Sequence, residues 1–133
     1  MESALDDSLV QDTTKVLEQM CIDFEVRVMS AHLTPELVHD YAQTARDRGL
    51  EVLIAAASGS AALAGALAST TTLPVIGIPM TSSELKGIDA LMATAQMPPG
   101  VPVACMAVGS SVSYTHLRAH ETRHDLVCRL LLE

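Results

Sequence analysis

Apolar residues in this chain recur with two periods, one typical of strands and one typical of amphipathic helices. Val52–Ala57 is an uninterrupted apolar run, which predicts a strand buried on both faces. Phe24–Met29 alternates apolar and charged residues at period two, which predicts a second strand. Thr34 and Pro35 then mark a helix start, because threonine suits the N-cap and proline the first turn. In chain order we predict helices over 7–20, 35–48, 61–68 and 83–97, and strands over 24–29, 52–57, 73–78 and 101–108.

Alternating strands and helices joined by short loops are typical of a parallel sheet with helices on both faces. We therefore predict an α/β fold of three layers. A helix comes first, where such folds normally open with a strand, and no helix pattern follows the strand predicted at 101–108. We expect the first strand and the C-terminal helix to be missing. Neighbouring strands would then have unpaired ladder groups, at a cost comparable with a domain's whole stability of about 5–15 kcal/mol.

Composition narrows the class of protein. The net charge is −8 and no basic stripe occurs, which argues against a nucleic-acid partner. No run of roughly eighteen apolar residues and no signal-peptide pattern is present, so we predict a cytoplasmic protein without a membrane span. Cys21, Cys105 and Cys128 are too few and too widely spaced for a disulfide framework or a zinc cluster. We expect Cys21 and Cys105, which stand among apolar residues, to be buried.

The composition changes abruptly at about residue 112. Residues 112–133 resemble the in-frame translation of a transposase sequencing adapter, so we divide the chain into a domain over 1–109 and a non-native tail over 110–133. His116, His120 and His124 lie four residues apart and would share one side of a helix, a spacing that suits metal ligands. Because they fall in this tail, we predict no metal site.

His32 is the strongest candidate for chemistry, because it follows a predicted strand at the sheet edge where α/β proteins bind ligands. A histidine there can exchange protons near neutral pH, although it can also merely cap backbone groups. His39 is expected on a helix surface. The turn at 58–60 precedes a helix and is small enough for backbone N–H groups to approach an anion. With the polar loops at 3–6 and 80–83, it outlines a pocket for a phosphorylated small molecule.

Four segments occur in the order and spacing of one known family. They are Ser30-Ala31-His32-Leu33-Thr34-Pro35, then 72–79, 87–91 and 96–104. Over about residues 1–109 the chain resembles the PurE family, the class I N5-carboxyaminoimidazole ribonucleotide mutases of purine biosynthesis. The resemblance implies a flavodoxin-like fold, a homo-octamer and an isomerase. Its reaction would move the carboxylate of a phosphorylated aminoimidazole ribonucleotide from N5 to C4, and we expect no cofactor.

The resemblance also implies roles for single residues. His32 matches the histidine of the family's Ser-Ala-His, which acts as general acid and base on the ring. The family's Met-Gly-Ser-x-Ser-Asp loop matches residues 1–6. With the polar loops, this gives the predicted substrate-binding positions, which are Ser3, Asp6, Ser30, Leu33, Ser58 and Gly59.

Several positions depart from the family's pattern. Leu33 stands where the family has the arginine that holds the substrate phosphate, and Ala62 stands where its Gly-Gly-Ala-Ala-His loop has histidine. Glu2 and Leu5 replace the glycine and the second serine of the first loop. These changes affect substrate affinity more than the fold.

Two other hypotheses therefore stay open. One is a diverged, non-catalytic paralogue that binds a ligand or serves as an assembly subunit. The other is a direct carboxylase, which residues 72–77 disfavour.

Overall fold

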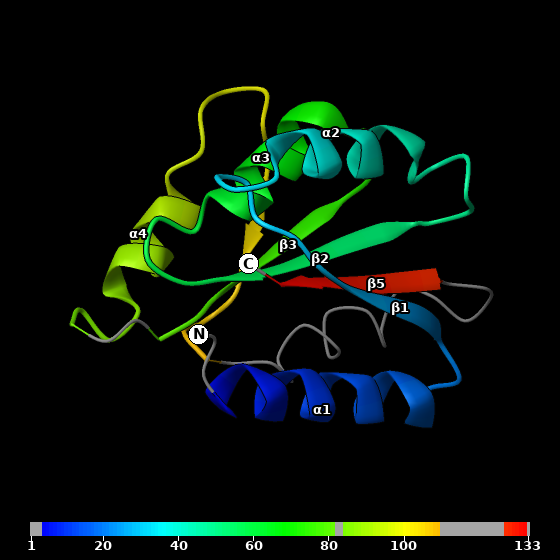
Figure 1. The fold of residues 1–133 in the computed structure, drawn as a ribbon, viewed down its shortest axis with the longest axis horizontal. Coiled ribbons are helices and arrows are strands. Elements are labelled where there is room, and N and C mark those ends of the chain that lie inside the picture. Colours follow the sequence, from blue (N-terminus) through cyan, green and yellow to red (C-terminus); the bar gives the residue numbers. More distant parts are fainter. Residues whose placement is uncertain (1–3, 82–83, 110–126, 133) are drawn as a thin grey trace.

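The computed structural model describes the backbone of residues 4–81, 84–109 and 127–132, and the side chains of 11–81 and 84–109 (Figure 1). Helices and strands alternate along most of this part, as predicted. In chain order the elements are α1 (Ala4–Gln19), β1 (Asp23–Val28), α2 (Pro35–Thr44), β2 (Val52–Ala57), α3 (Ala62–Thr70), β3 (Val75–Pro79), α4 (Ile88–Ala95), β4 (Ala104–Cys105) and β5 (Val127–Leu132).

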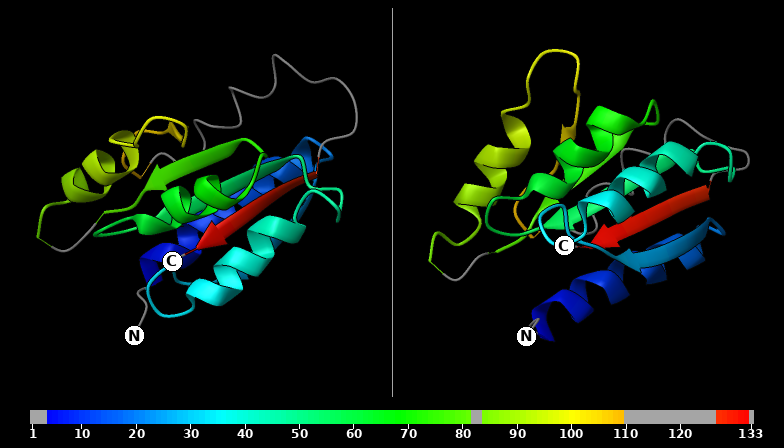
Figure 2. Two further views of the ribbon diagram at one scale, coloured as in Figure 1. Left: turned by 90° about the horizontal axis from the view of Figure 1, so that it is seen from above. Right: turned by 45° about the horizontal axis from the view of Figure 1, so that its top comes forward.

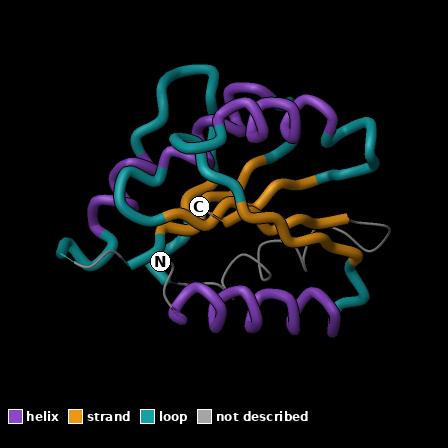
Figure 3. Tube along the Cα trace, viewed as in Figure 1, coloured by secondary structure: helices purple, strands orange, loops and turns teal. Residues whose placement is uncertain are grey.

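The strands form one parallel sheet in the order β1-β5-β2-β3-β4. Helix α1 covers one face of the sheet, and α2 and α3 cover the other (Figures 1 and 3). This confirms the predicted three-layer α/β fold. None of the helices in the described ranges is both long and apolar enough to cross a membrane.

Alternate residues of β2 enter two separate cores. Val52, Ile54 and Ala56 pack in one cluster with Leu17 of α1. Leu53, Ala55 and Ala57 pack in the other cluster, which includes side chains of α2 and α3 such as Val38, Leu63 and Leu67. All six residues of β2 are buried, as the uninterrupted apolar run predicts. Because a fully buried leucine contributes roughly 1.5–3 kcal/mol, these two clusters hold the three layers together.

The prediction of unpaired ladder groups beside β1 and β2 is wrong. Strand β5 lies between them and pairs in parallel with both, so that Leu130 is opposite Val26 of β1 and Ile54 of β2. Residues 127–132 belong to the tail that the sequence sets apart from the domain. Hydrogen bonds between strands are made by main-chain groups. An extended segment can therefore form them whether it belongs to the native domain or to an adapter-derived tail. The adapter origin of the tail is a separate matter and stays a prediction.

The strand predicted at 101–108 is wrong in length and in burial. Only Ala104 and Cys105 form strand β4, and the side chains around them are half-buried or exposed. This segment lies at the edge of the sheet and pairs only with β3, where a proline such as Pro102 is tolerated. Backbone hydrogen bonds from Met106 to Gly77 and from Gly109 to Pro79, both 2.9 Å, still guide it along β3.

The helix predicted at 83–97 begins later, at Ile88. Lys86 and Gly87 both have positive φ, 50° and 89°, which an α-helix cannot contain. The proposed cap at Ser82 and Ser83 lies outside the described residues.

In β3, Gly77 lets α4 approach the sheet, because a Cβ at this position would collide with Thr94. Glycine is therefore required at this strand position.

The cysteines are less buried than predicted. Cys21 is exposed, because α1 ends at Gln19 and the chain reverses through Cys21 with a positive φ of 54°. Cys105 is half-buried in the edge strand β4, and this burial raises the pKa of its thiol. Cys128 lies in β5.

Candidate functional site

The loop that follows β1 is held in shape by its own polar side chains. The Oγ atom of Ser30 accepts hydrogen bonds from the backbone N–H groups of His32 at 3.3 Å and Leu33 at 3.2 Å. Thr34 Oγ1 accepts from the Ser30 N–H and donates to the Ser30 carbonyl, both at 3.0 Å. Thr34 is the N-cap of α2, as predicted, but its side chain does not cap the helix. Instead it closes the turn that presents His32.

The loop that follows β2 turns with two residues in the left-handed region. Gly59 has φ 60° and Ala61 has φ 44°, and the Ala61 N–H donates to the Ser58 carbonyl at 3.0 Å. Glycine adopts such a backbone without strain, whereas Ala61 carries a Cβ and pays a steric penalty. Ala61 is the N-cap of α3, and the turn leaves Ser60 exposed at the carboxyl edge of the sheet.

A hydrogen bond between these two loops defines the candidate site. His32 Nε2 lies 2.8 Å from Ser60 Oγ, although the residues are 28 positions apart in the sequence. The two loops follow β1 and β2, the strands on either side of β5. His32 is therefore held at the carboxyl edge of the sheet near the end of β5, between the loops that follow β1 and β2. Such an imidazole can accept and donate a proton close to a bound ligand.

Most of the predicted site residues meet at this edge. His32, Ser30 and Leu33 come from the first loop, and Ser58 and Gly59 come from the second. Asp6 lies in the first turns of α1, which begins on the side of the sheet where the strands end (Figures 1 and 2). Ser3 lies outside the described residues. Leu33 is 85 % exposed, so its side chain projects from the loop into solvent.

Ser60 is the site residue that sequence reasoning did not select. The Ser58-Gly59-Ser60 turn carries the signal, because it predicts a small polar loop at this edge, but only Ser58 and Gly59 are among the predicted substrate-binding positions. Which serine faces His32 depends on the spacing of two loops across the sheet. That spacing is set by the insertion of β5 between β1 and β2, and local sequence does not encode it.

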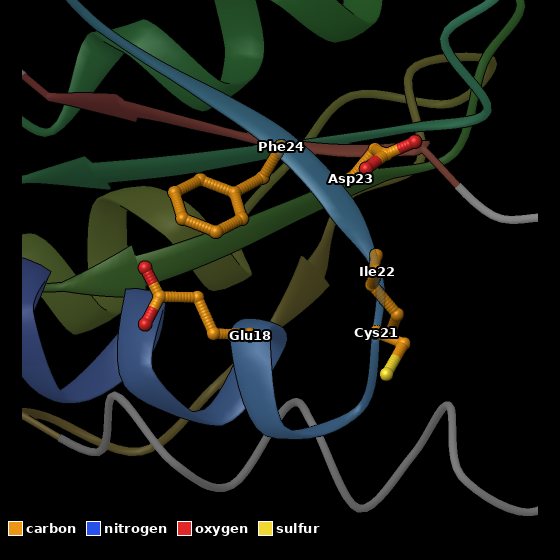
Figure 4. A pocket seen from close by; sticks show the side chains of 5 residues that line it. All are labelled: Glu18, Cys21, Ile22, Asp23 and Phe24. Carbon is orange, nitrogen blue, oxygen red and sulfur yellow. The ribbon is translucent and has the colours of Figure 1, made fainter.

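Two hollows are lined by described residues. One is lined by residues of the α1–β1 connection, including Glu18, Cys21 and Phe24, at the start of β1 (Figure 4). It is at the opposite end of β1 from His32. The other lies between α2 and α3 and borders the His32 loop at Ala31 and Pro35. It is also lined by His39, whose Nδ1 is 3.5 Å from Thr70 Oγ1. His39 is exposed, as predicted.

The described residues contain no group of three or more His, Cys, Asp or Glu side chains placed to hold a metal ion. The three histidines of the tail, His116, His120 and His124, lie outside those ranges.

Comparison with known proteins assigns the chain to a family. A profile of the AIR carboxylase family matches residues 1–121. The chain belongs to the AIR carboxylase family. This confirms the PurE-type resemblance found in the sequence motifs, and the match extends past residue 109, where we expected the domain to end.

Several family members with assigned names are similar to this chain in sequence. The chain is 49 % identical over 108 residues to the N5-carboxyaminoimidazole ribonucleotide mutase of Pyrococcus abyssi, covering 81 % of this chain and 62 % of that protein. It is also 49 % identical to the proteins of the same name from Aquifex aeolicus, over 113 residues, and Saccharolobus solfataricus, over 111 residues. Those two alignments cover 85 % and 84 % of this chain, and 68 % and 70 % of the relatives. The chain thus spans about two thirds of its relatives' length.

Proposed function

We propose that this chain carries an N5-carboxyaminoimidazole ribonucleotide mutase activity, with His32 as general acid and base. One observation carries the proposal. The Ser30–Thr34 and Ser58–Ala61 loops converge on His32 at the carboxyl edge of the sheet, in a chain 49 % identical to proteins that bear this name. The reaction needs one group that gives a proton and takes one back, and imidazole does both near neutral pH.

The proton balance of the proposed reaction closes on this single residue. In the first step the bond between N5 and the carboxylate carbon breaks, CO2 is released beside the ring, and the nitrogen gains a proton from His32. In the second step C4 of the ring attacks that CO2, a carbon–carbon bond forms, and the C4 proton passes to His32. The protein returns to its starting state, and neither step calls for a cofactor.

The remaining site residues are proposed to bind the substrate. Ser30, Ser58 and Gly59 surround His32 with small and polar groups, and Asp6 belongs to the helix that begins on the same side of the sheet. Ser3 is included on the strength of the family's first loop. Leu33 occupies the position of the phosphate-binding arginine but offers the phosphate no charge.

The direct test is a turnover assay of the purified chain. We expect the chain to convert N5-carboxyaminoimidazole ribonucleotide into the 4-carboxy isomer, followed by the ultraviolet absorbance of the product. Aminoimidazole ribonucleotide with excess bicarbonate is the comparison, and faster product formation from that mixture would make the chain a carboxylase instead. Absence of the isomer in both assays would contradict the mutase proposal.

The exposed Leu33 favours a second candidate function. A paralogue that has lost its phosphate anchor could still bind a nucleotide without turning it over. Calorimetric titration with the 4-carboxy product separates the two functions, because binding without turnover in the assay above would identify the non-catalytic paralogue.

We predict that Leu33→Arg lowers the KM for the nucleotide on the order of tenfold to a hundredfold. A charge-assisted hydrogen bond contributes roughly 1.5–3 kcal/mol, and an arginine fork can bind a phosphate with two such bonds. Steady-state kinetics measure the effect. The position is exposed, so the variant should unfold at the same denaturant concentration as the parent.

The control for Leu33→Arg is Leu37→Arg. Leu37 is also exposed, at 52 %, and lies in the next helix rather than in the loop. The Leu37→Arg variant adds the same positive charge but places that charge outside the His32 loop. An equal fall in KM for both variants, or a gain that persists with the dephosphorylated nucleoside, would show that residue 33 does not contact the phosphate.

We also propose that the protein works in the cytoplasm as a homo-octamer, as the family resemblance implies. Several large apolar side chains of the described part are exposed and available for subunit contacts. They are Met20, Val26, Val28, Leu33, Leu37, Leu85, Ile88 and Met92. Val26 and Val28 lie on β1, which forms one edge of the sheet.

A further inference from the structure

We propose that Ser60 is a positioning residue that fixes the orientation of the His32 ring by accepting a hydrogen bond from its Nε2–H. The inference deepens the proposed function and rests on it, because it assigns the partner through which the general acid and base is held. The family loop that matches residues 58–65 has alanine at the position of Ser60. The hydroxyl is thus a feature of this chain rather than of the family motif.

The contact itself is specific. His32 Nε2 and Ser60 Oγ are 2.8 Å apart, a distance typical of a good hydrogen bond. Among the described residues, the contact with Ser60 is the hydrogen bond of the imidazole ring itself. The bonds to Ser30 Oγ use the backbone N–H groups of His32 and Leu33 instead. Without Ser60 the ring would be free to rotate on an exposed loop.

The surrounding backbone holds both partners in place. Ser30 and Thr34 close the turn that carries His32, through four hydrogen bonds of 3.0–3.3 Å. Ser60 lies between Gly59 and Ala61, both in the left-handed region, and the Ala61 N–H is bonded to the Ser58 carbonyl. The two loops are fixed independently, so a single hydrogen bond between them is enough to define the ring's position.

The contact also decides which ring nitrogen is available to a substrate. Nε2 is occupied by the serine, so the nitrogen that exchanges a proton with a ligand is Nδ1. Nδ1 can act as a base only when it lacks a proton, and the neutral ring then carries its proton on Nε2. In this tautomer Nε2–H donates to Ser60 Oγ, both in the neutral ring and in the imidazolium. The serine hydroxyl can also donate to an unprotonated Nε2, and it is the base role assigned to Nδ1 that requires the arrangement in which Ser60 accepts.

The test combines a spectroscopic readout with kinetics on the full chain. Long-range ¹H–¹⁵N correlation spectra at a pH where the ring is neutral report which nitrogen carries the proton, and His32→Asn assigns the signals. We expect the Nε2–H form in the parent protein and a mixture of both tautomers in Ser60→Ala. We also expect kcat to fall on the order of tenfold in Ser60→Ala with KM within about twofold, since the whole acid–base contribution is roughly 10²–10⁴-fold.

Two further variants keep the test selective. Ser60→Thr retains the hydroxyl and should restore both the spectrum and most of kcat. Ser69→Ala makes the same chemical change on α3, where the Ser69 hydroxyl donates to the Ala66 carbonyl, and should change neither readout. A parent spectrum dominated by Nδ1–H, or an unchanged spectrum in Ser60→Ala, would overturn the inference. A parent chain without mutase activity counts against the proposed function, whereas the spectrum still decides the role of Ser60.

Discussion

Replacing His32 with asparagine is expected to lower kcat by roughly 10²–10⁴-fold, the usual contribution of a general acid and base. Asparagine has a similar size and still forms hydrogen bonds, but it does not exchange protons near neutral pH. The substitution therefore separates proton transfer from the contact with Ser60. Steady-state turnover of N5-carboxyaminoimidazole ribonucleotide measures the loss, and KM should change far less than kcat.

The matched control for this variant is His39→Asn. His39 is exposed on α2, away from the two loops, and carries the same imidazole. We expect its kcat to equal that of the parent. Both histidines are exposed, so neither variant should change the free energy of unfolding by more than about 0.5 kcal/mol. Equal turnover by His32→Asn and the parent would remove His32 from the mechanism.

Replacing Leu130 with proline is expected to abolish cooperative unfolding or to lower stability by at least roughly 1–3 kcal/mol, the cost of leaving a ladder carbonyl unpaired. Leu130 lies in β5 opposite Val26 on one side and Ile54 on the other, at the centre of the sheet. Proline removes a backbone N–H from the ladder, and its ring disturbs the neighbouring strand. Sheets therefore tolerate proline mainly on edge strands. Whole domains are stable by only about 5–15 kcal/mol, so the loss is a large share of the total.

Denaturant unfolding followed by circular dichroism, together with hydrogen exchange of β1 and β2 amides, measures this effect. Leu130→Ala is the control, because it keeps the backbone N–H and should leave the amides of both neighbours protected. If the proline variant unfolds at the same denaturant concentration as the parent, with protected β1 and β2 amides, β5 does not occupy the slot between them.

A disulfide tests the same strand without unfolding the protein. Cys128 lies directly opposite Val52 in the parallel ladder, and neighbouring strands are about 4.8 Å apart, within the range a disulfide spans. Val52→Cys should therefore crosslink to Cys128 on oxidation. Leu53→Cys places its thiol on the opposite face of β2 and should not, which peptide mapping by mass spectrometry distinguishes.

The sequence alone determined the elements that depend on local pattern. The apolar run at 52–57 coincides with β2, because a strand between two helical layers must be apolar on both faces. Thr34 and Pro35 placed the start of α2 correctly, since proline's fixed φ suits the first turn. Four short motifs in order indicated the family, and the one around His32 gave the candidate acid and base. All of these signals lie within short stretches of chain.

Only the tertiary structure decided what depends on neighbours far away in the sequence. Position at the sheet edge shortened the predicted strand at 101–108 to Ala104–Cys105, because a strand with one partner needs neither full burial nor a continuous ladder. The main chain of residues 127–132 completes the sheet between β1 and β2, since backbone pairing does not depend on where a segment comes from. Ser60 meets His32 because that sheet order sets the distance between their loops, and no local pattern specifies such a distance.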